Sequence, residues 1–230
     1  MAKNQLEMMK AIGGYFSLEL PPVQVNYIHE KGIHLNSGRN ALEYILSSLT
    51  HIQCLWMPYY TCDVVLQPIE RLCIPYSFYH VKMDFTLTDE IVLGDGEYLI
   101  YTNYFGIMDG YCKELAIRYD SQLILDNAQA FYAPHIEKIN TFYSPRKFVG
   151  VPDGGIAFIN QPSYIELMQD HSYSRCAHLL KRHDLSPIEG YNDFKENSHK
   201  IAASPLSSMS TLTYKMMSSL DFKFIKEKRI

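Results

Sequence analysis

The chain has 230 residues, of which 47% are hydrophobic and 20% are charged, and its formal net charge at pH 7 is -4. This composition excludes disordered and fibrous classes and is sufficient for one large domain with its own core. Nucleic-acid binders usually present a basic excess or stripe, so the slight acidic excess here argues against a nucleic-acid partner.

The five cysteines have neither the short pair spacing of a zinc site nor that of a disulfide framework. We therefore expect reduced, mostly buried thiols, no metal site and a cytoplasmic protein. Three charged residues among the first ten argue against a signal peptide. The longest uncharged run, between Glu43 and Asp63, contains polar residues and Pro58, so we expect no membrane span.

Short apolar runs alternate with amphipathic segments along the first two thirds of the chain. Apolar residues at i, i+3, i+4 and i+7 predict a helix after Arg39, and residues 63–72 are also predicted to be helical. Short apolar, β-branched and aromatic runs predict strands at 54–57, 77–81, 98–102, 123–126, 141–143 and 156–159. This alternation predicts an α/β fold, a three-layer α/β/α sandwich with a mainly parallel sheet.

The pattern changes after Pro162. Residues 163–183, 186–200 and 205–218 are predicted to be helical, with Pro187 and Pro205 placed as helix starts. The end of the chain, 220–230, combines phenylalanines with lysines and resembles a helix that continues onto a further segment. We therefore expect the sequence to be incomplete.

Polar residues follow predicted strands or precede predicted helices, where ligands bind in open α/β sheets. Residues 36–40 stand before the first helix, and Gly38 with the helix N-terminus suits a phosphate. The alternative interpretation is an ordinary Ser/Asn helix cap. Asp126 ends a predicted strand, where its carboxylate can bond a protonated ring nitrogen and Gln129 can reach the same ligand. The alternative is that Asp126 caps a helix.

Two further segments carry candidate chemistry. Lys147 is flanked by Phe148 and Val149, and a lysine at an apolar site loses its proton readily and acts as a nucleophile. The alternative is a surface lysine in a loop. The aromatic turn at 58–62 supplies either a stacking wall for a ligand or ordinary core packing. The dinucleotide, Walker, HExxH and GxSxG patterns are absent from the sequence.

Six motifs occur in order, at residues 13–20, 36–39, 58–62, 103–106, 126–129 and 144–147, the last followed by Gly154 and Gly155. This series resembles the large domain of the DegT/DnrJ-type aminotransferases, which are pyridoxal 5'-phosphate (PLP) enzymes of fold type I. The resemblance covers residues 11–160 by motif and the rest more loosely. It implies a sheet of about seven strands and a PLP-binding large domain over 1–230. In that organisation the helical segment 163–230 leads into a small C-terminal domain that the sequence lacks.

The resemblance also implies roles for individual residues. Lys147 matches the lysine that bonds to PLP and then moves the proton, and Asp126 matches the acid that keeps the pyridine nitrogen protonated. The other cofactor contacts that it implies are Ser37, Gly38, Arg39 and Ser144 for the phosphate, Gln129 near the ring and its phenolic oxygen, Tyr60 or Cys62 for stacking, and Asn103 with Tyr104 at the border of the ring or substrate.

The family resemblance implies a reaction as well. A lysine at position 147, where dehydrating relatives carry histidine, favours transamination over deoxygenation. The implied amino donor is glutamate, and the implied acceptor is a keto-sugar, commonly nucleotide-linked, in polysaccharide or amino-sugar biosynthesis. The implied assembly is a homodimer with a shared active site. Two alternatives stay open: a truncated, non-catalytic PLP-fold protein that binds or regulates, and an unrelated α/β domain.

Overall fold

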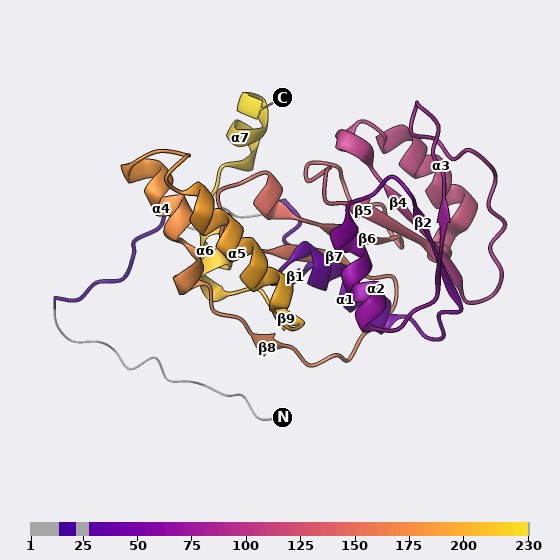
Figure 1. Ribbon diagram of the computed structural model, residues 1–230, viewed down its shortest axis with the longest axis horizontal. Coiled ribbons are helices and arrows are strands. Elements are labelled where there is room, and N and C mark those ends of the chain that lie inside the picture. The colour runs from indigo at the N-terminus through magenta and orange to yellow at the C-terminus, as the bar shows by residue number, and fades with distance from the viewer. Residues whose placement is uncertain (1–13, 22–27, 230) are drawn as a thin grey trace.

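The structure is a computed structural model that describes residues 14–21 and 28–229 (Figure 1). Residues 1–13, which include the start of the predicted domain and the first residue of the 13–20 motif, lie outside the described residues, as do 22–27 and Ile230. The strands are β1 (Ile33–Leu35), β2 (Cys54–Pro58), β3 (Tyr76–Tyr79), β4 (Glu97–Thr102), β5 (Leu123–Asn127), β6 (Asn140–Tyr143), β7 (Gly155–Phe158), β8 (Met168–Gln169) and β9 (Ser207–Ser208).

These strands form one sheet in the order β3-β2-β4-β5-β6-β7-β1-β9-β8. The strands from β3 to β6 in that order are parallel, β7 is antiparallel to β6, and β1 is antiparallel to β7 and to β9. The α-helices are α1 (Gly38–Ser48), α2 (Leu66–Arg71), α3 (Asp109–Tyr119), α4 (Ala177–Asp184), α5 (Tyr191–Ala203), α6 (Thr211–Ser218) and α7 (Phe222–Arg229). Short 3-10 helices are η1 (Asp63–Val65), η2 (Tyr104–Gly106), η3 (Asp120–Gln122), η4 (Pro145–Lys147) and η5 (Tyr173–Arg175).

Successive residues of the central strands face opposite sides of the sheet, as the two-residue period of a strand requires. Ile100 and Ile124 pack in a cluster with the apolar side chains of α1. Leu99 and Leu125 pack instead with residues of α3, including Leu115. Helices therefore cover both faces, and the predicted three-layer, mainly parallel α/β fold is confirmed.

The second half of the chain extends one end of this sandwich. Figure 1 shows α4, α5, α6 and α7 gathered at one end of the molecule and α3 at the opposite end. Buried side chains of α6 and α7, Met217 and Phe222, share a cluster with Phe131 and Tyr143. Among the described residues, no helix has the length and apolar character needed to cross a membrane.

Among the described residues the sheet has nine strands, whereas the sequence predicts six and the resemblance implies about seven. Of the three strands that were not predicted, β8 and β9 contain two residues each and extend the sheet beyond β1. The three residues of β1 are too few to show an alternating pattern in the sequence, and this strand was not predicted.

The prediction of continuous helices after Pro162 is wrong in three places. Residues 163–176 contain β8 and η5 before α4 begins, because Met168 and Gln169 pair with β9 and form the edge of the sheet. Pro205 precedes this strand instead of starting a helix, and its carbonyl oxygen accepts hydrogen bonds from the Asn36 and Asn40 amides. Pro187 lies in a turn that leads into α5 at Tyr191, and the Ser186 hydroxyl accepts a hydrogen bond from the backbone N–H of Glu189 in this turn.

Candidate functional site

A cavity of about 650 Å³ opens where β5 and β6 end and α1 begins. Eight of the predicted site residues line it: Ser37, Gly38, Arg39, Cys62, Asp126, Gln129, Ser144 and Lys147. Parallel strands end at the same edge of a sheet, so β5 and β6 bring residues 126 and 144 together although eighteen positions separate them. A volume of several hundred Å³ is typical of small-molecule and cofactor sites.

The N-terminus of α1 forms one wall of this cavity. Ser37 is the N-cap, and its hydroxyl accepts a hydrogen bond from the backbone N–H of Asn40 at 3.1 Å. The helix-cap interpretation of this residue is therefore correct for its side chain. The cap leaves the first backbone N–H groups, at Gly38 and Arg39, without carbonyl partners inside the helix. These groups and the helix dipole favour an anion.

Gly38 also allows Ser144 to approach this helix end closely. A Cβ atom at position 38 would lie 3.1 Å from Ser144 Cβ and 3.2 Å from Ser144 Oγ, which is tighter than most Cβ contacts. The hydroxyl of Ser144 therefore lies beside the N-terminus of α1. Arg39 adds a guanidinium at the same wall, where it donates to the side-chain oxygen of Gln67 at 2.7 Å. Burial, together with the charge of Arg71, lowers the pKa of Arg39.

Asp126 lies near the end of β5 and is 4% exposed. One carboxylate oxygen accepts the backbone N–H of Ala128 at 2.8 Å, and the other is 3.5 Å from the Thr102 hydroxyl. Residues 128–129 form a turn, so the helix-cap interpretation of Asp126 is wrong. Burial raises the pKa of this carboxyl, whereas the Ala128 hydrogen bond and the charge of Lys147 lower it. Since its second oxygen has one weak hydrogen bond, the carboxylate retains accepting capacity toward the cavity.

Lys147 ends η4, a turn in which its backbone N–H donates to the carbonyl of Ser144 at 3.2 Å. This turn places Ser144 and Lys147 on the same cavity. The side chain of Lys147 is exposed, whereas Val149 is buried in the cluster that contains Phe131. The apolar neighbours in the sequence therefore belong to the core, while the lysine itself is on the cavity.

Three predicted site residues, Asn103, Tyr60 and Tyr104, lie outside the cavity lining. The Asn103 amide donates to Asp109 at 2.8 Å and accepts the N–H of Met108, so it holds the start of α3. Tyr60 is 58% exposed and stacks on Tyr104, with ring centroids 5.7 Å apart. Tyr104 itself is buried, and its hydroxyl donates to the Tyr60 carbonyl.

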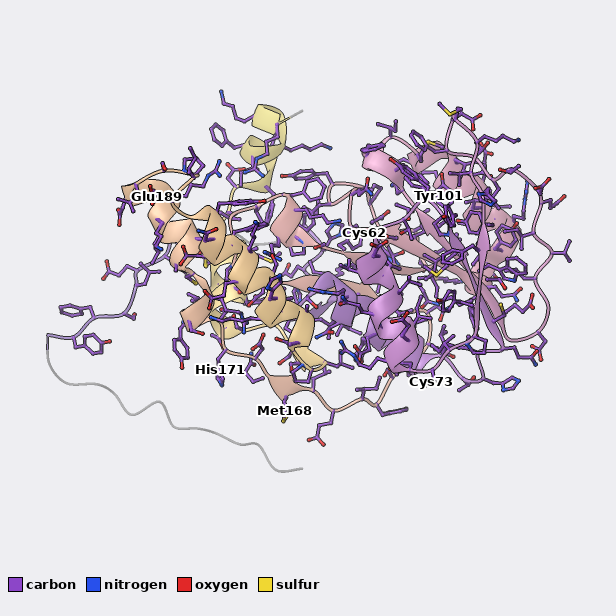
Figure 2. The ribbon with its side chains drawn as sticks, in the orientation of Figure 1. Cys62, Cys73, Tyr101, Met168, His171 and Glu189 are labelled. Atoms are coloured by element: carbon purple, nitrogen blue, oxygen red, sulfur yellow. The ribbon has the colours of Figure 1, made fainter. Side chains whose placement is uncertain are left out.

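Cys62 and Gln129 are both at the cavity. Cys62 precedes η1 and is the one of the two stacking candidates that lines the cavity. Figure 2 labels Cys62 between the two ends of the molecule, well away from Glu189 at the periphery. Gln129 accepts the backbone N–H of Phe105 at 3.3 Å through its side-chain oxygen.

Helix α5 contributes a wall of the cavity that was not predicted from the sequence. Arg146, Asp153 and five side chains of α5 line the cavity, the latter being Phe194, Ser198, His199, Ile201 and Ala202. Arg146 is adjacent to Lys147 in the sequence and could have been noticed there. The α5 residues follow it by about fifty positions, and no spacing in the sequence relates the two segments.

No family model matches this chain, and no curated protein matches it. Solved aminotransferase structures do match. The sugar aminotransferase CalS13 from Micromonospora echinospora has a TM-score of 0.43 and 15% identity, over 56% of this chain and 42% of that chain. DesV from S. venezuelae has a TM-score of 0.46 and 22% identity, over 57% and 40% of the two chains. A DegT DnrJ EryC1 StrS aminotransferase from Brucella abortus has a TM-score of 0.40 and 17% identity, over 56% and 41%.

The family in the last of these names is the one that the sequence motifs resemble. The chain spans about two fifths of the length of these three solved chains.

Proposed function

We propose that the chain is the PLP-binding large domain of an aminotransferase that transfers an amino group to a keto-sugar. The observation that carries this proposal is the convergence of Lys147, Asp126 and the anion-binding end of α1 on one cavity. These are a nucleophilic amine, a buried carboxylate and a phosphate cradle, which are the three groups that such a cofactor needs.

The residues fit PLP in their donor chemistry. Gly38 leaves room for Ser144 at the end of α1, so two hydroxyls and the free N–H groups of the helix face one anion subsite, with Arg39 beside them. Asp126 is buried with spare accepting capacity, and a protonated ring nitrogen would relieve the cost of its burial. In this assignment Ser37, Gly38, Arg39 and Ser144 hold the phosphate, Gln129 and Cys62 border the ring, and Asn103 and Tyr60 support the surrounding turns.

PLP, when bound, supplies a protonated ring that withdraws electrons from the carbon at which the amino group is exchanged. Asp126 would hold the proton on the ring nitrogen. The Lys147 amine would hold the cofactor and would move a proton at the reacting carbon. The turn of η4 places the Lys147 backbone next to Ser144, so one short turn carries both the residue that would contact the phosphate and the residue that would react.

The proposed function also includes the substrates, the assembly and the cellular compartment. The motif resemblance supports glutamate as the amino donor, a nucleotide-linked keto-sugar as the acceptor, and a homodimer. All five cysteines are free thiols, which supports a reducing compartment such as the cytoplasm, but only Cys112 is buried, so the expectation of mostly buried thiols is wrong.

The test is an absorbance spectrum of the chain with PLP, followed by borohydride reduction and peptide mass spectrometry. We expect the added mass of the reduced cofactor on Lys147 and no such adduct in Lys147→Ala. Lys113→Ala is the matched control, because Lys113 is an exposed lysine on α3 that does not line the cavity. An adduct that persists in Lys147→Ala would contradict the proposal.

Addition of glutamate then distinguishes an enzyme from a binding protein. A shift of the cofactor band, with release of 2-oxoglutarate, is expected for an aminotransferase. A stable band that ignores glutamate would identify a non-catalytic PLP-fold protein instead.

A further inference from the structure

Arg146 is a cation at the cavity that the proposed assignment of the cofactor contacts does not use. It precedes Lys147 in η4, and its side chain extends to α5. One terminal nitrogen donates to the Ser198 hydroxyl at 2.7 Å, and the guanidinium carbon lies 4.6 Å from the centre of the Phe194 ring. These two contacts from α5 hold the guanidinium in place at the cavity wall.

Neither of these contacts neutralises the charge of Arg146. Within the described part of the chain, neither Arg146 nor Arg39 has a carboxylate within 4.0 Å. The Nε atom of Arg146 is buried and lacks a hydrogen-bond partner. Asp153 also lines the cavity, but its carboxylate is already engaged by Arg175 and by the hydroxyl of Thr213.

The two cavity arginines are close enough to influence each other. The positive charge of Arg39, after burial, contributes to lowering the pKa of Arg146. The charge of Asp153 acts in the opposite direction and offsets part of this repulsion, and an anion bound near both arginines would offset the remainder. Guanidinium groups bind phosphate in a bidentate manner, with more directional specificity than an ammonium group.

The charge of a phosphate monoester also calls for a second cation. Such a group carries roughly -1.5 to -2 at pH 7. The N-terminus of α1 supplies the equivalent of roughly +0.5 and Arg39 one further charge, which balances a charge of about -1.5 and leaves about half a charge unbalanced on the full dianion. We propose that Arg146 is the second guanidinium of this anion subsite and binds the phosphate of the cofactor together with Arg39, so that the subsite's charge is supplied within one chain. This inference rests on the proposed function.

The test compares two probes that differ by the phosphate alone. Binding of PLP and of pyridoxal, which lacks the phosphate, is titrated by absorbance for the full chain and for Arg146→Gln. We expect the dissociation constant of PLP to rise roughly ten- to a hundredfold, the usual range for one hydrogen bond to a charged group, and that of pyridoxal to stay within about twofold. Arg182→Gln is the control, because Arg182 is an exposed arginine on α4 outside the cavity.

Equal losses for PLP and pyridoxal would overturn the inference, since they would indicate a structural role or an effect on Lys147. Unchanged PLP affinity in Arg146→Gln would also overturn it and would assign Arg146 to an acidic group of the substrate or to no ligand. If Arg146→Gln does not fold, Arg146→Lys is tested instead, again by comparing the change in the dissociation constant of PLP with that of pyridoxal. A smaller loss of PLP affinity is expected for this variant, because an ammonium group binds phosphate as a point charge.

A titration with inorganic phosphate, measured by calorimetry, separates this inference from the proposed function. If the wild-type chain forms no adduct at Lys147 but binds inorganic phosphate in a manner that depends on Arg146, the anion subsite stands and the aminotransferase proposal fails. If the adduct forms and phosphate dependence on Arg146 is absent, the proposed function stands and the inference about Arg146 fails.

Discussion

Gly155 begins β7 directly against the loop that precedes α1. A Cβ atom at this position would lie 2.0 Å from the carbonyl oxygen of Ser37, 2.3 Å from its carbonyl carbon and 2.7 Å from the nitrogen of Gly38. All three atoms are backbone, so no side-chain rotation relieves the contact. Since ordinary contacts begin at 3.4 Å, the Gly155→Ala substitution requires the loop and the strand to separate by about 1.4 Å.

The cost of this separation in free energy of unfolding can be estimated. Overpacking a well-packed interior costs about 1–3 kcal/mol, and occasionally more. Because two hydrogen-bonded backbone segments must move here, we expect the free energy of unfolding to fall by about 3 kcal/mol. For a chain of this size that corresponds to a decrease in Tm of roughly 6–12 °C.

The same displacement moves Ser37 and Gly38 away from the cavity. A shift of about 1 Å at a positioning residue can cost about a hundredfold in function, so we expect PLP affinity to fall as well. Urea unfolding followed by circular dichroism gives the first quantity, and an absorbance titration with PLP gives the second. Gly110→Ala is the control: nothing lies within 4 Å of its added Cβ, and alanine in α3 should stabilise by up to about 1 kcal/mol. A Gly155→Ala protein with unchanged unfolding free energy and PLP affinity would refute this reasoning.

Two other predictions concern buried charge. Arg175→Met leaves the fully buried Asp153 without its guanidinium partner, so we expect a loss of about 3–5 kcal/mol in urea unfolding, whereas Arg182→Met on the exposed face of α4 should change little. Burial lowers the pKa of His29 from 6.5 to about 4. As the pH falls, His29 therefore takes up a proton in the unfolded chain before it does so in the folded chain. The free energy of unfolding should be unaffected by this residue above pH 6.5 and should fall between pH 6.5 and 4, by on the order of 3 kcal/mol. His29→Gln should flatten the pH dependence of unfolding, His183→Gln should not, and equal slopes for the two would contradict the assignment.

The sequence predicts the first two thirds of the fold well because the local signals there agree with one another. The helix α1 has an apolar stripe that packs on the sheet, and β4 and β5 are runs of residues that fit a buried parallel strand. The prediction for residues 163–176 fails because their apolar spacing is compatible with a helix, whereas β9 offers backbone partners that only the folded chain contains.

The candidate site was likewise predictable from the sequence only in part. Strand ends that lie side by side in a parallel sheet can be inferred from their order, and Asp126, Ser144 and Lys147 are found together in this way. Asn103 could not be separated from them by its sequence context, because a polar residue at a strand end either faces a ligand or caps the next helix. In the fold its amide is occupied by Asp109 and Met108.

The wall that α5 forms links the position of Arg146 to the segment before β7. The contacts that hold Arg146 come from Phe194 and Ser198 on α5. Helix α5 is itself held to the segment before β7 by the Asn197 amide, which donates to the carbonyl of Pro152 at 2.6 Å. The same segment continues into Gly155, against which the loop before α1 packs. The positions of Arg146 and of the N-terminus of α1 at the cavity therefore depend on one continuous set of contacts. Substitutions at Asn197 and at Gly155, on different elements, should impair the same ligand contact.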